Sequence, residues 1–133
     1  MFNHIMIGSN DIERSKSFYN AVLGTLGFAG QPITNVASSG HTRLFYMHDG
    51  GTLCISEPIN SEPATFANGG TIGFKCSSPE QVAQFHDVAI ANGGHSIEDP
   101  PGIRDGGALG PMHLSYVRDP DGNKLCALHR MPT

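Results

Sequence analysis

The sequence contains an internal repeat, and this feature limits the possible folds more than any other. Shifting the chain by 67 residues aligns the segment 4–8 with the segment 71–75. At the same offset, three further pairs coincide without a gap: Glu13 with Glu80, Phe18 with Phe85 and Gly27 with Gly94. A repeating unit of this size buries its hydrophobic face only by packing against another copy. The 133 residues are therefore expected to form one domain from two similar modules.

Each half begins with a short alternating strand and continues with helical periodicity. The first helix is predicted over residues 12–23, with Asn10 or Asp11 as its N-cap. Ser78 at the cap and Pro79 at the first helical position predict the second helix, which stops at 92–94. The apolar face of each helix should pack on a sheet. These faces comprise Ile12, Ser15, Phe18, Tyr19 and Val22 in the first helix, and Val82, Phe85, His86 and Ala89 in the second.

Strand patterns follow each helix. Residues 42–47 and 52–56 flank a turn at 48–51, and residues 112–118 and 124–129 flank a turn at 119–123. Weaker strands are predicted at 31–37 and 94–98, which completes the order β-α-β-β-β in each half. Module one then spans about 1–57, a linker about 58–70 and module two about 71–133. The long irregular segment 99–111 is predicted to lie over a binding cleft.

The composition excludes several classes of partner. The net charge is −4 with only 8 Lys and Arg, which argues against a nucleic-acid or anionic membrane surface. No apolar run approaches the roughly 20 residues of a membrane helix, and no secretion signal is visible. The three cysteines cannot all pair within one chain, and none belongs to a C-x-x-C motif. We therefore expect a cytoplasmic protein with reduced thiols.

Three segments carry a family resemblance: the strand 4–7, the helix and glycine pattern of 14–28, and the hairpin 117–123. In their order and spacing they resemble the vicinal oxygen chelate superfamily, which includes glyoxalases, bleomycin-resistance proteins and extradiol dioxygenases. The resemblance covers nearly the whole chain. It implies an α+β fold in which two βαβββ modules form a half-open mixed β-barrel around a cleft. Members of the family commonly pair as homodimers.

The resemblance also implies four positions for metal ligands in that cleft. Here they hold His4, Cys54, Thr71 and Cys126, and only His4 matches the usual residue. Hard cations prefer carboxylates and imidazoles, so an ordinary site for such a metal is not expected. His4, Cys54 and Cys126 would instead suit zinc. Two alternatives remain open: the cysteines are small apolar fillers, or one thiol acts as a nucleophile beside His4.

Other residues are candidates for chemistry or for substrate binding. A tyrosine near the position of Tyr116 binds or protonates substrate in the dioxygenase branch, so Tyr116 and His4 are the catalytic candidates. Arg104 on the glycine-flanked loop and Arg43 on a module-one strand are candidates for holding an anionic substrate. His113 and Thr71 are further substrate-binding candidates, although a regular strand would turn His113 away from the face of Tyr116.

Two functions remain compatible with these residues. The first is a glyoxalase-like enzyme of the lyase, isomerase or dioxygenase class, with an atypical or absent metal site. The second is a non-catalytic protein that binds or sequesters a small molecule or drug, as bleomycin-resistance proteins do. Both functions imply a small-molecule ligand, and a fold alone does not distinguish them.

Overall fold

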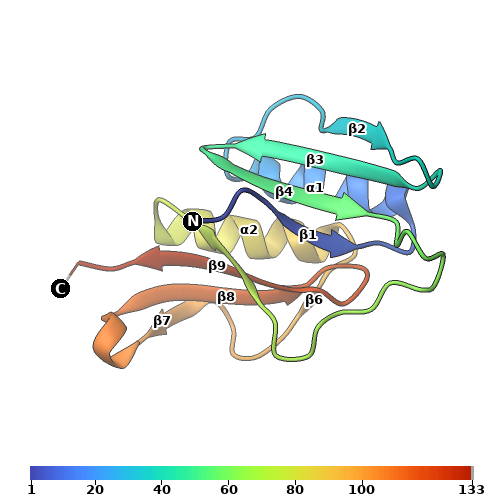
Figure 1. Ribbon diagram of the computed structural model, residues 1–133. Coiled ribbons are helices and arrows are strands. Elements are labelled where there is room, and N and C mark those ends of the chain that lie inside the picture. The colour runs from blue at the N-terminus through green and yellow to red at the C-terminus, as the bar shows by residue number, and fades with distance from the viewer. Residues whose placement is uncertain (133) are drawn as a thin grey trace.

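A computed structural model describes residues 1–132 and contains the predicted repeat of elements (Figure 1). The first half consists of β1 (Ile5–Gly8), α1 (Ile12–Gly24), β2 (Ile33–Val36), β3 (Thr42–His48) and β4 (Gly51–Ser56). The second half consists of β5 (Ile72–Lys75), α2 (Pro79–Ala91), β6 (His95–Ser96), β7 (Gly102–Arg104), the 3₁₀ turn η1 (Gly107–Leu109), β8 (Met112–Arg118) and β9 (Lys124–Arg130). The order βαβββ therefore occurs twice, with β7 and η1 added in the second half.

The strands form two mixed sheets with the same connectivity. Sheet A has the order β1-β4-β3-β2, and sheet B has the order β5-β9-β8-β6 with β7 also paired to β8. In sheet A, Met6 of β1 lies opposite Cys54 of β4. In sheet B, Gly73 of β5 lies opposite Cys126 of β9. Because Met6 and Gly73 are related by the repeat offset, the strand register is the same in both halves.

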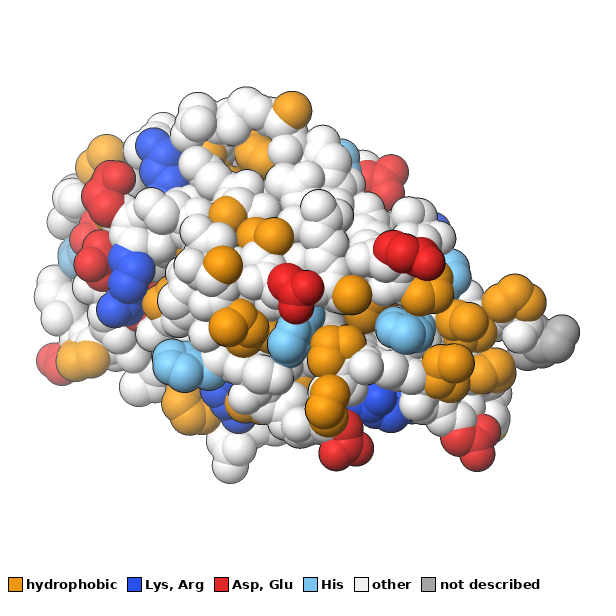
Figure 2. All heavy atoms as spheres, turned by 180° about the vertical axis from the view of Figure 1, so that it is seen from behind, with side chains coloured by type: hydrophobic (Ala, Val, Ile, Leu, Met, Phe, Trp, Pro, Cys, Tyr) orange, Lys and Arg blue, Asp and Glu red, His pale blue; other side chains and the backbone are white. Residues whose placement is uncertain are grey.

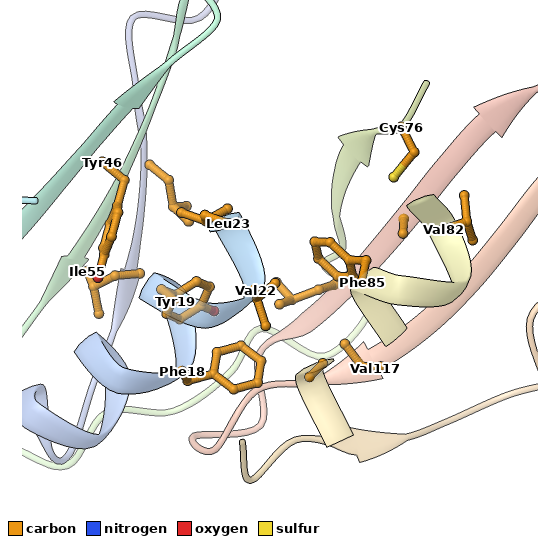
Figure 3. Close-up of a cluster of buried hydrophobic side chains, with 14 of the residues drawn as sticks. Phe18, Tyr19, Val22, Leu23, Tyr46, Ile55, Cys76, Val82, Phe85 and Val117 are labelled. Atoms are coloured by element: carbon orange, nitrogen blue, oxygen red, sulfur yellow. The ribbon is translucent and has the colours of Figure 1, made fainter. Parts of the chain in front are cut away.

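The two helices lie side by side behind the sheets (Figure 1), α1 against sheet A and α2 against sheet B. Burial of apolar side chains between these layers is the main favourable contribution to folding. Figure 3 shows Tyr19 and Leu23 of α1 directed toward sheet A, whereas Val22 faces Phe85 of α2. The core contains residues of both halves: Phe18, Tyr19, Val22, Leu23, Leu44, Tyr46, Leu53, Ile55, Cys76, Val82, Phe85, Ala89, Val117, Leu125 and Ala127.

Local sequence accounts for the ends of the helices and for the first hairpin. The side chain of Asp11 accepts a hydrogen bond from the amide of Arg14, and that of Ser78 accepts one from the amide of Gln81. Between β3 and β4, Asp49 and Gly50 both have positive φ, 51° and 80°. Two such residues are typical of a tight turn whose twist matches the strands.

The segment 99–111 is more ordered than the prediction of an irregular loop. Its residues Gly102–Arg104 form β7, which pairs with β8, and η1 follows. Two arginines hold the segment in place. Arg104 Nη2 donates to the carbonyls of Asp99 and Pro100 at 3.2 and 3.0 Å, and Arg130 Nη1 donates to that of Leu109 at 3.1 Å. Apart from Gly102, the first residue of β7, the prolines and glycines that suggested a loop lie before or after this short strand.

A buried carboxylate connects the second hairpin to the first half of the chain. Asp119, only 2 % exposed, accepts a hydrogen bond from the Tyr19 hydroxyl at 2.5 Å. It also accepts hydrogen bonds from the amides of Asp121 and Asn123 and from Asn123 Nδ2. Next to it, Asp121 pairs with Arg14 of α1 at 2.9 Å. We call these contacts the Asp119 latch. Because buried polar groups are costly when unpaired, the latch fixes the hairpin on α1.

Candidate functional site

Each sheet has one face turned away from the helices, which we call the open face. Side chains alternate along a strand, so the residues between the core positions lie on this face. On sheet B the open face carries a small hydrophobic cluster separate from the main core. Its members are Met112, Leu114 and Cys126, with Tyr116 and Leu128 packed against them. The open face is therefore partly apolar and offers contacts to a small molecule.

Tyr116 lies at the centre of the polar groups on this part of the open face. It lies directly opposite Cys126 in the β8–β9 pairing. The Lys124 ammonium lies 4.8 Å from the centroid of the Tyr116 ring, within the range of a cation–π contact. Lys124 also forms an ion pair with Glu98, a residue in the left-handed region with φ 58°. A phenol, a thiol and an ion pair thus lie together on sheet B.

The environment of these groups keeps both acids protonated. Burial, and then the neighbouring Cys126, raise the pKa of the Tyr116 hydroxyl above its ordinary value; Glu98 adds to the rise and Arg104 opposes it. Burial also raises the pKa of the Cys126 thiol, although a hydrogen bond from Tyr116 acts in the other direction. At neutral pH, Tyr116 is therefore a hydrogen-bond donor and Cys126 is a neutral thiol.

The equivalent positions of sheet A carry different groups. Cys54 again occupies the central place on its strand, opposite Phe45 rather than a tyrosine. The Cys54 side chain is fully buried, and burial raises its pKa, whereas the nearby Arg43 guanidinium lowers it. The Nε atom of Arg43 is buried and has no hydrogen-bond partner within residues 1–132. The position that Arg43 occupies on sheet A is occupied by Leu114 on sheet B. Sheet A therefore has an unpaired cation where sheet B has an apolar side chain.

The residues at the predicted metal positions do not fit a metal site within one chain. Cys54 lies on β4 of sheet A and Cys126 lies on β9 of sheet B, and within residues 1–132 no strand pairing joins the two sheets. Among the described residues, no three His, Cys, Asp or Glu side chains are grouped so that they could hold a metal ion. The zinc site remains a prediction without support from this geometry.

Three other candidates lie away from Tyr116. His4 is exposed just before β1, and its Nδ1 bonds to Asn3 Oδ1 at 2.8 Å. Thr71 is exposed beside the groove between β1 and β5. His113 is on the strand face that carries Ser115, whose hydroxyl donates to the Val82 carbonyl of α2. His113 therefore faces the helix side, as the alternation of a regular strand predicts.

The structure also adds residues that the sequence reasoning did not single out. Lys124 lies two residues before Cys126 on β9, so strand alternation alone places both on the open face. No sequence signal identified Glu98, because it reaches Lys124 from a segment outside the strands. Arg104 is half-buried and hydrogen bonded to its own segment. It belongs to β7, and not to an irregular loop as the sequence suggested, and this strand holds it near Tyr116.

The helix side of the molecule has a mixed surface. Figure 2 shows acidic, basic, histidine and hydrophobic side chains interspersed on it, without a broad basic area. A nucleic-acid surface would need such an area. In the described part of the chain, neither 13-residue helix is long and apolar enough to cross a bilayer.

Comparisons with known proteins agree with this geometry. A family model described as the Glyoxalase/Bleomycin resistance protein/Dioxygenase superfamily matches residues 1–127. A glyoxalase/bleomycin resistance protein from Albidiferax ferrireducens T118 has 55 % sequence identity and a TM-score of 0.88, with 98 % of this chain and 99 % of that chain covered. No curated protein matches the chain.

Two more distant structures share the fold. A genomically encoded fosfomycin resistance protein from Listeria monocytogenes has 16 % identity and a TM-score of 0.70, with 100 % of this chain and 93 % of that chain covered. A glyoxalase I mutant from Zea mays has 17 % identity and a TM-score of 0.71. That comparison covers 96 % of this chain and 45 % of the maize chain. At these identities the likeness concerns the fold alone.

Proposed function

Because the chain belongs to the Glyoxalase/Bleomycin resistance protein/Dioxygenase superfamily, we propose that it is a small-molecule enzyme of the glyoxalase-like type. In this proposal the Tyr116 hydroxyl, and not a resident metal, polarises an oxygen of the substrate. The observation that carries the proposal is the protonated, half-buried phenol on the open face of sheet B, with Lys124 against its ring. Lyase and isomerase chemistry fits such a proton donor, because both can require polarisation of a carbonyl or alkoxide oxygen.

The surrounding groups support this role for Tyr116. The raised pKa keeps the phenol neutral, so that its hydroxyl can donate a hydrogen bond to an oxygen of the substrate. Arg104 lowers the pKa of the phenol, so its positive charge favours an oxyanion at this position, and the Lys124 ammonium lies against the same ring. Glu98 opposes that charge through its ion pair with Lys124. His4 lines a different pocket, which neither Tyr116 nor Cys126 lines, so the proposed reaction gives it no step.

A substitution that removes only the hydroxyl tests the proposal. Turnover is first measured against panels of hemithioacetals and catechols, with wild type and the surface variant Asp87→Ala as a control. For a compound that is turned over, Tyr116→Phe should lower kcat on the order of 100-fold and change KM by less than about threefold. Equal kcat values for wild type and Tyr116→Phe would refute the role of the phenol.

A second function, sequestration of a small molecule without turnover, is favoured by one specific observation. Cys54 and Cys126 are buried thiols whose pKa values are raised, so both act as neutral, compact residues where a metal-dependent enzyme needs charged ligands. The same panels distinguish the two functions. A compound that binds tightly and shifts the amide signals of Tyr116 and Cys126, but is never turned over, would establish sequestration and exclude the enzymatic proposal.

We also propose that the protein pairs as a homodimer. Large apolar side chains are exposed on strands of sheet A, among them Ile33 and Val36 of β2, Met6 of β1 and Met47 of β3. Burying such residues against a second copy would remove them from water. Sedimentation equilibrium should give twice the chain mass, and Met47→Glu should lower the apparent association constant. A monomer at every concentration would contradict the proposal.

A further inference from the structure

A second cavity lies apart from the open-face cluster, where the two halves meet near the N-terminus. Its volume is about 300 Å³. It is enclosed by the N-terminal segment before β1, the C-terminal end of α1, the β3–β4 hairpin and strand β5. We call it the junction pocket. None of Tyr116, Cys126, Cys54 and Arg43 is among its lining residues, so the proposed catalytic role does not account for it.

The walls of the junction pocket are mainly aliphatic and aromatic. Its apolar side chains include Ile5, Leu23, Leu26, Leu53, Ile72 and Phe74. An apolar void of about 150 Å³ is enough to hold one benzene ring. A cavity of about 300 Å³ therefore accommodates an aromatic ring together with a short arm.

The rim of the pocket carries polar and charged side chains. Lys75 is exposed at the end of β5, and within residues 1–132 its side chain takes part in no ion pair or hydrogen bond. His4 and His48 also line the pocket, with Asp49 as its one carboxylate. Asp49 lies in the hairpin turn and is exposed. The rim thus holds one ammonium, two imidazoles and one carboxylate, and the carboxylate belongs to the exposed turn.

Both histidines have one ring nitrogen that is not hydrogen bonded within residues 1–132, and in the neutral imidazole this nitrogen is an acceptor. His4 Nδ1 donates to the Asn3 side-chain oxygen at 2.8 Å, which leaves Nε2 free. His48 Nε2 donates to the Leu26 carbonyl at 3.0 Å, which leaves Nδ1 free. The His48 ring is further held edge-on against Phe28, with centroids 6.4 Å apart. These contacts orient the imidazoles before a ligand arrives.

We propose that the junction pocket is a binding site for a small amphipathic carboxylate, with its apolar part in the cavity and its anionic group at Lys75. The Lys75 ammonium above an apolar floor complements such a molecule in both charge and polarity. A neutral compound of the same shape would lack the ionic contact, and a cationic one would be repelled by Lys75. The pocket would then bind its ligand independently of any ligand on the open face.

Three matched probes test this site by NMR titration of the full chain: 3-phenylpropionate, 3-phenylpropan-1-ol and 3-phenylpropylamine. The carboxylate should bind about tenfold more tightly than the alcohol, a difference of about 1.4 kcal/mol. Its amide shifts should centre on Leu26, His48 and Lys75, with Tyr116 unaffected. Lys75→Met should reduce the affinity for the carboxylate to that of the alcohol. Lys75→Arg should retain it within about threefold.

Lys16→Met is the control, because Lys16 does not line the pocket and its loss should leave all three affinities unchanged. Equal binding of acid and alcohol, tighter binding of the amine, shifts centred on Tyr116, or no binding of the acid at about 10 mM would each overturn the proposal. Because the readout is at residues of the junction pocket, its failure would leave the proposed role of Tyr116 untouched.

Discussion

The two hairpins that complete the two halves share one strand register but differ in their turns and in their chemistry. The β3–β4 hairpin closes with two residues, Asp49 and Gly50, in left-handed conformations. The β8–β9 hairpin closes with five residues and contributes the buried Asp119 to the contact with α1. On the open face, Phe45 and Tyr116 occupy equivalent places opposite Cys54 and Cys126. The two halves thus share one strand pairing, whereas only the second half carries the buried carboxylate that contacts α1 and the phenol opposite a cysteine.

The largest expected effect concerns the Asp119 latch. Asp119→Ala removes the acceptor for the Tyr19 hydroxyl and for three hydrogen-bond donors of its own turn. We expect a loss of about 3–4 kcal/mol in the free energy of unfolding, because buried donors are left unpaired. Urea denaturation measures it. The exposed Asp87→Ala should cost less than about 0.5 kcal/mol, and a similar small cost for Asp119→Ala would mean that the latch does not hold the halves together.

Asp119→Asn refines this test through its pH dependence. Burial raises the pKa of Asp119 above its ordinary value of 3.8, although its hydrogen bonds oppose the rise. The folded protein therefore takes up this proton at a higher pH than the unfolded chain does. Relative to Asp119→Asn, the wild type should gain stability as the pH falls from neutral through the folded-state pKa toward 3.8. A relative loss of stability over that window would contradict the raised pKa.

The next largest effect is expected on kcat, from variants at the two equivalent aromatic positions, Phe45 and Tyr116. Phe45→Tyr introduces a phenol at the place in sheet A that corresponds to Tyr116. Because Lys124, Glu98 and Arg104 have no counterparts there, we expect this variant to retain the wild-type kcat. The double variant Phe45→Tyr, Tyr116→Phe should retain the deficit of Tyr116→Phe, on the order of 100-fold. Recovery of turnover in the double variant would show that the two faces are functionally interchangeable.

The smallest effect is expected on the alkylation rates of the three thiols, Cys54, Cys76 and Cys126. Burial raises all three pKa values, that of Cys76 to about 11, so alkylation by iodoacetamide at pH 8 should be slow at each site and slowest at Cys76. Arg43→Met should slow alkylation of Cys54 by about twofold, because the guanidinium lowers the pKa of that thiol. Mass spectrometry of the labelled peptides measures the rates, with Cys126 as the internal control. Faster labelling of Cys54 in the variant would contradict the assigned influence of Arg43.

Most of the fold could be predicted from the sequence because its signals are local. The offset of 67 residues, the caps Asp11 and Ser78, and the turn residues of both hairpins each act within a few positions of the chain. Even the orientation of His113 toward the helix side followed from strand alternation. The strand β7 escaped prediction because its pairing with β8 is a tertiary contact in a segment rich in proline and glycine.

The candidate site was less predictable, because it depends on contacts between segments that are distant in the sequence. The resemblance put Cys54 and Cys126 at equivalent positions, and their strand register confirms that equivalence. The pattern did not show whether the side chains at the predicted metal positions are grouped closely enough to hold a metal ion, and among the described residues no such group is present. Nor did it contain Glu98, whose approach to Lys124 depends on the path of a non-strand segment. Tyr116 was identified by resemblance, but its proton-retaining environment emerged only from its neighbours.

The one-sided character of the Asp119 latch has a consequence for the history of the chain. Tyr19 corresponds to His86 under the repeat offset, and His86 bonds to Ser96 instead of a buried carboxylate. A half-length ancestor that paired with itself would have formed any such contact twice, once across each side of its symmetry axis. A single chain that carries both copies needs the contact only once, so the equivalent residue His86 makes a different bond, to Ser96.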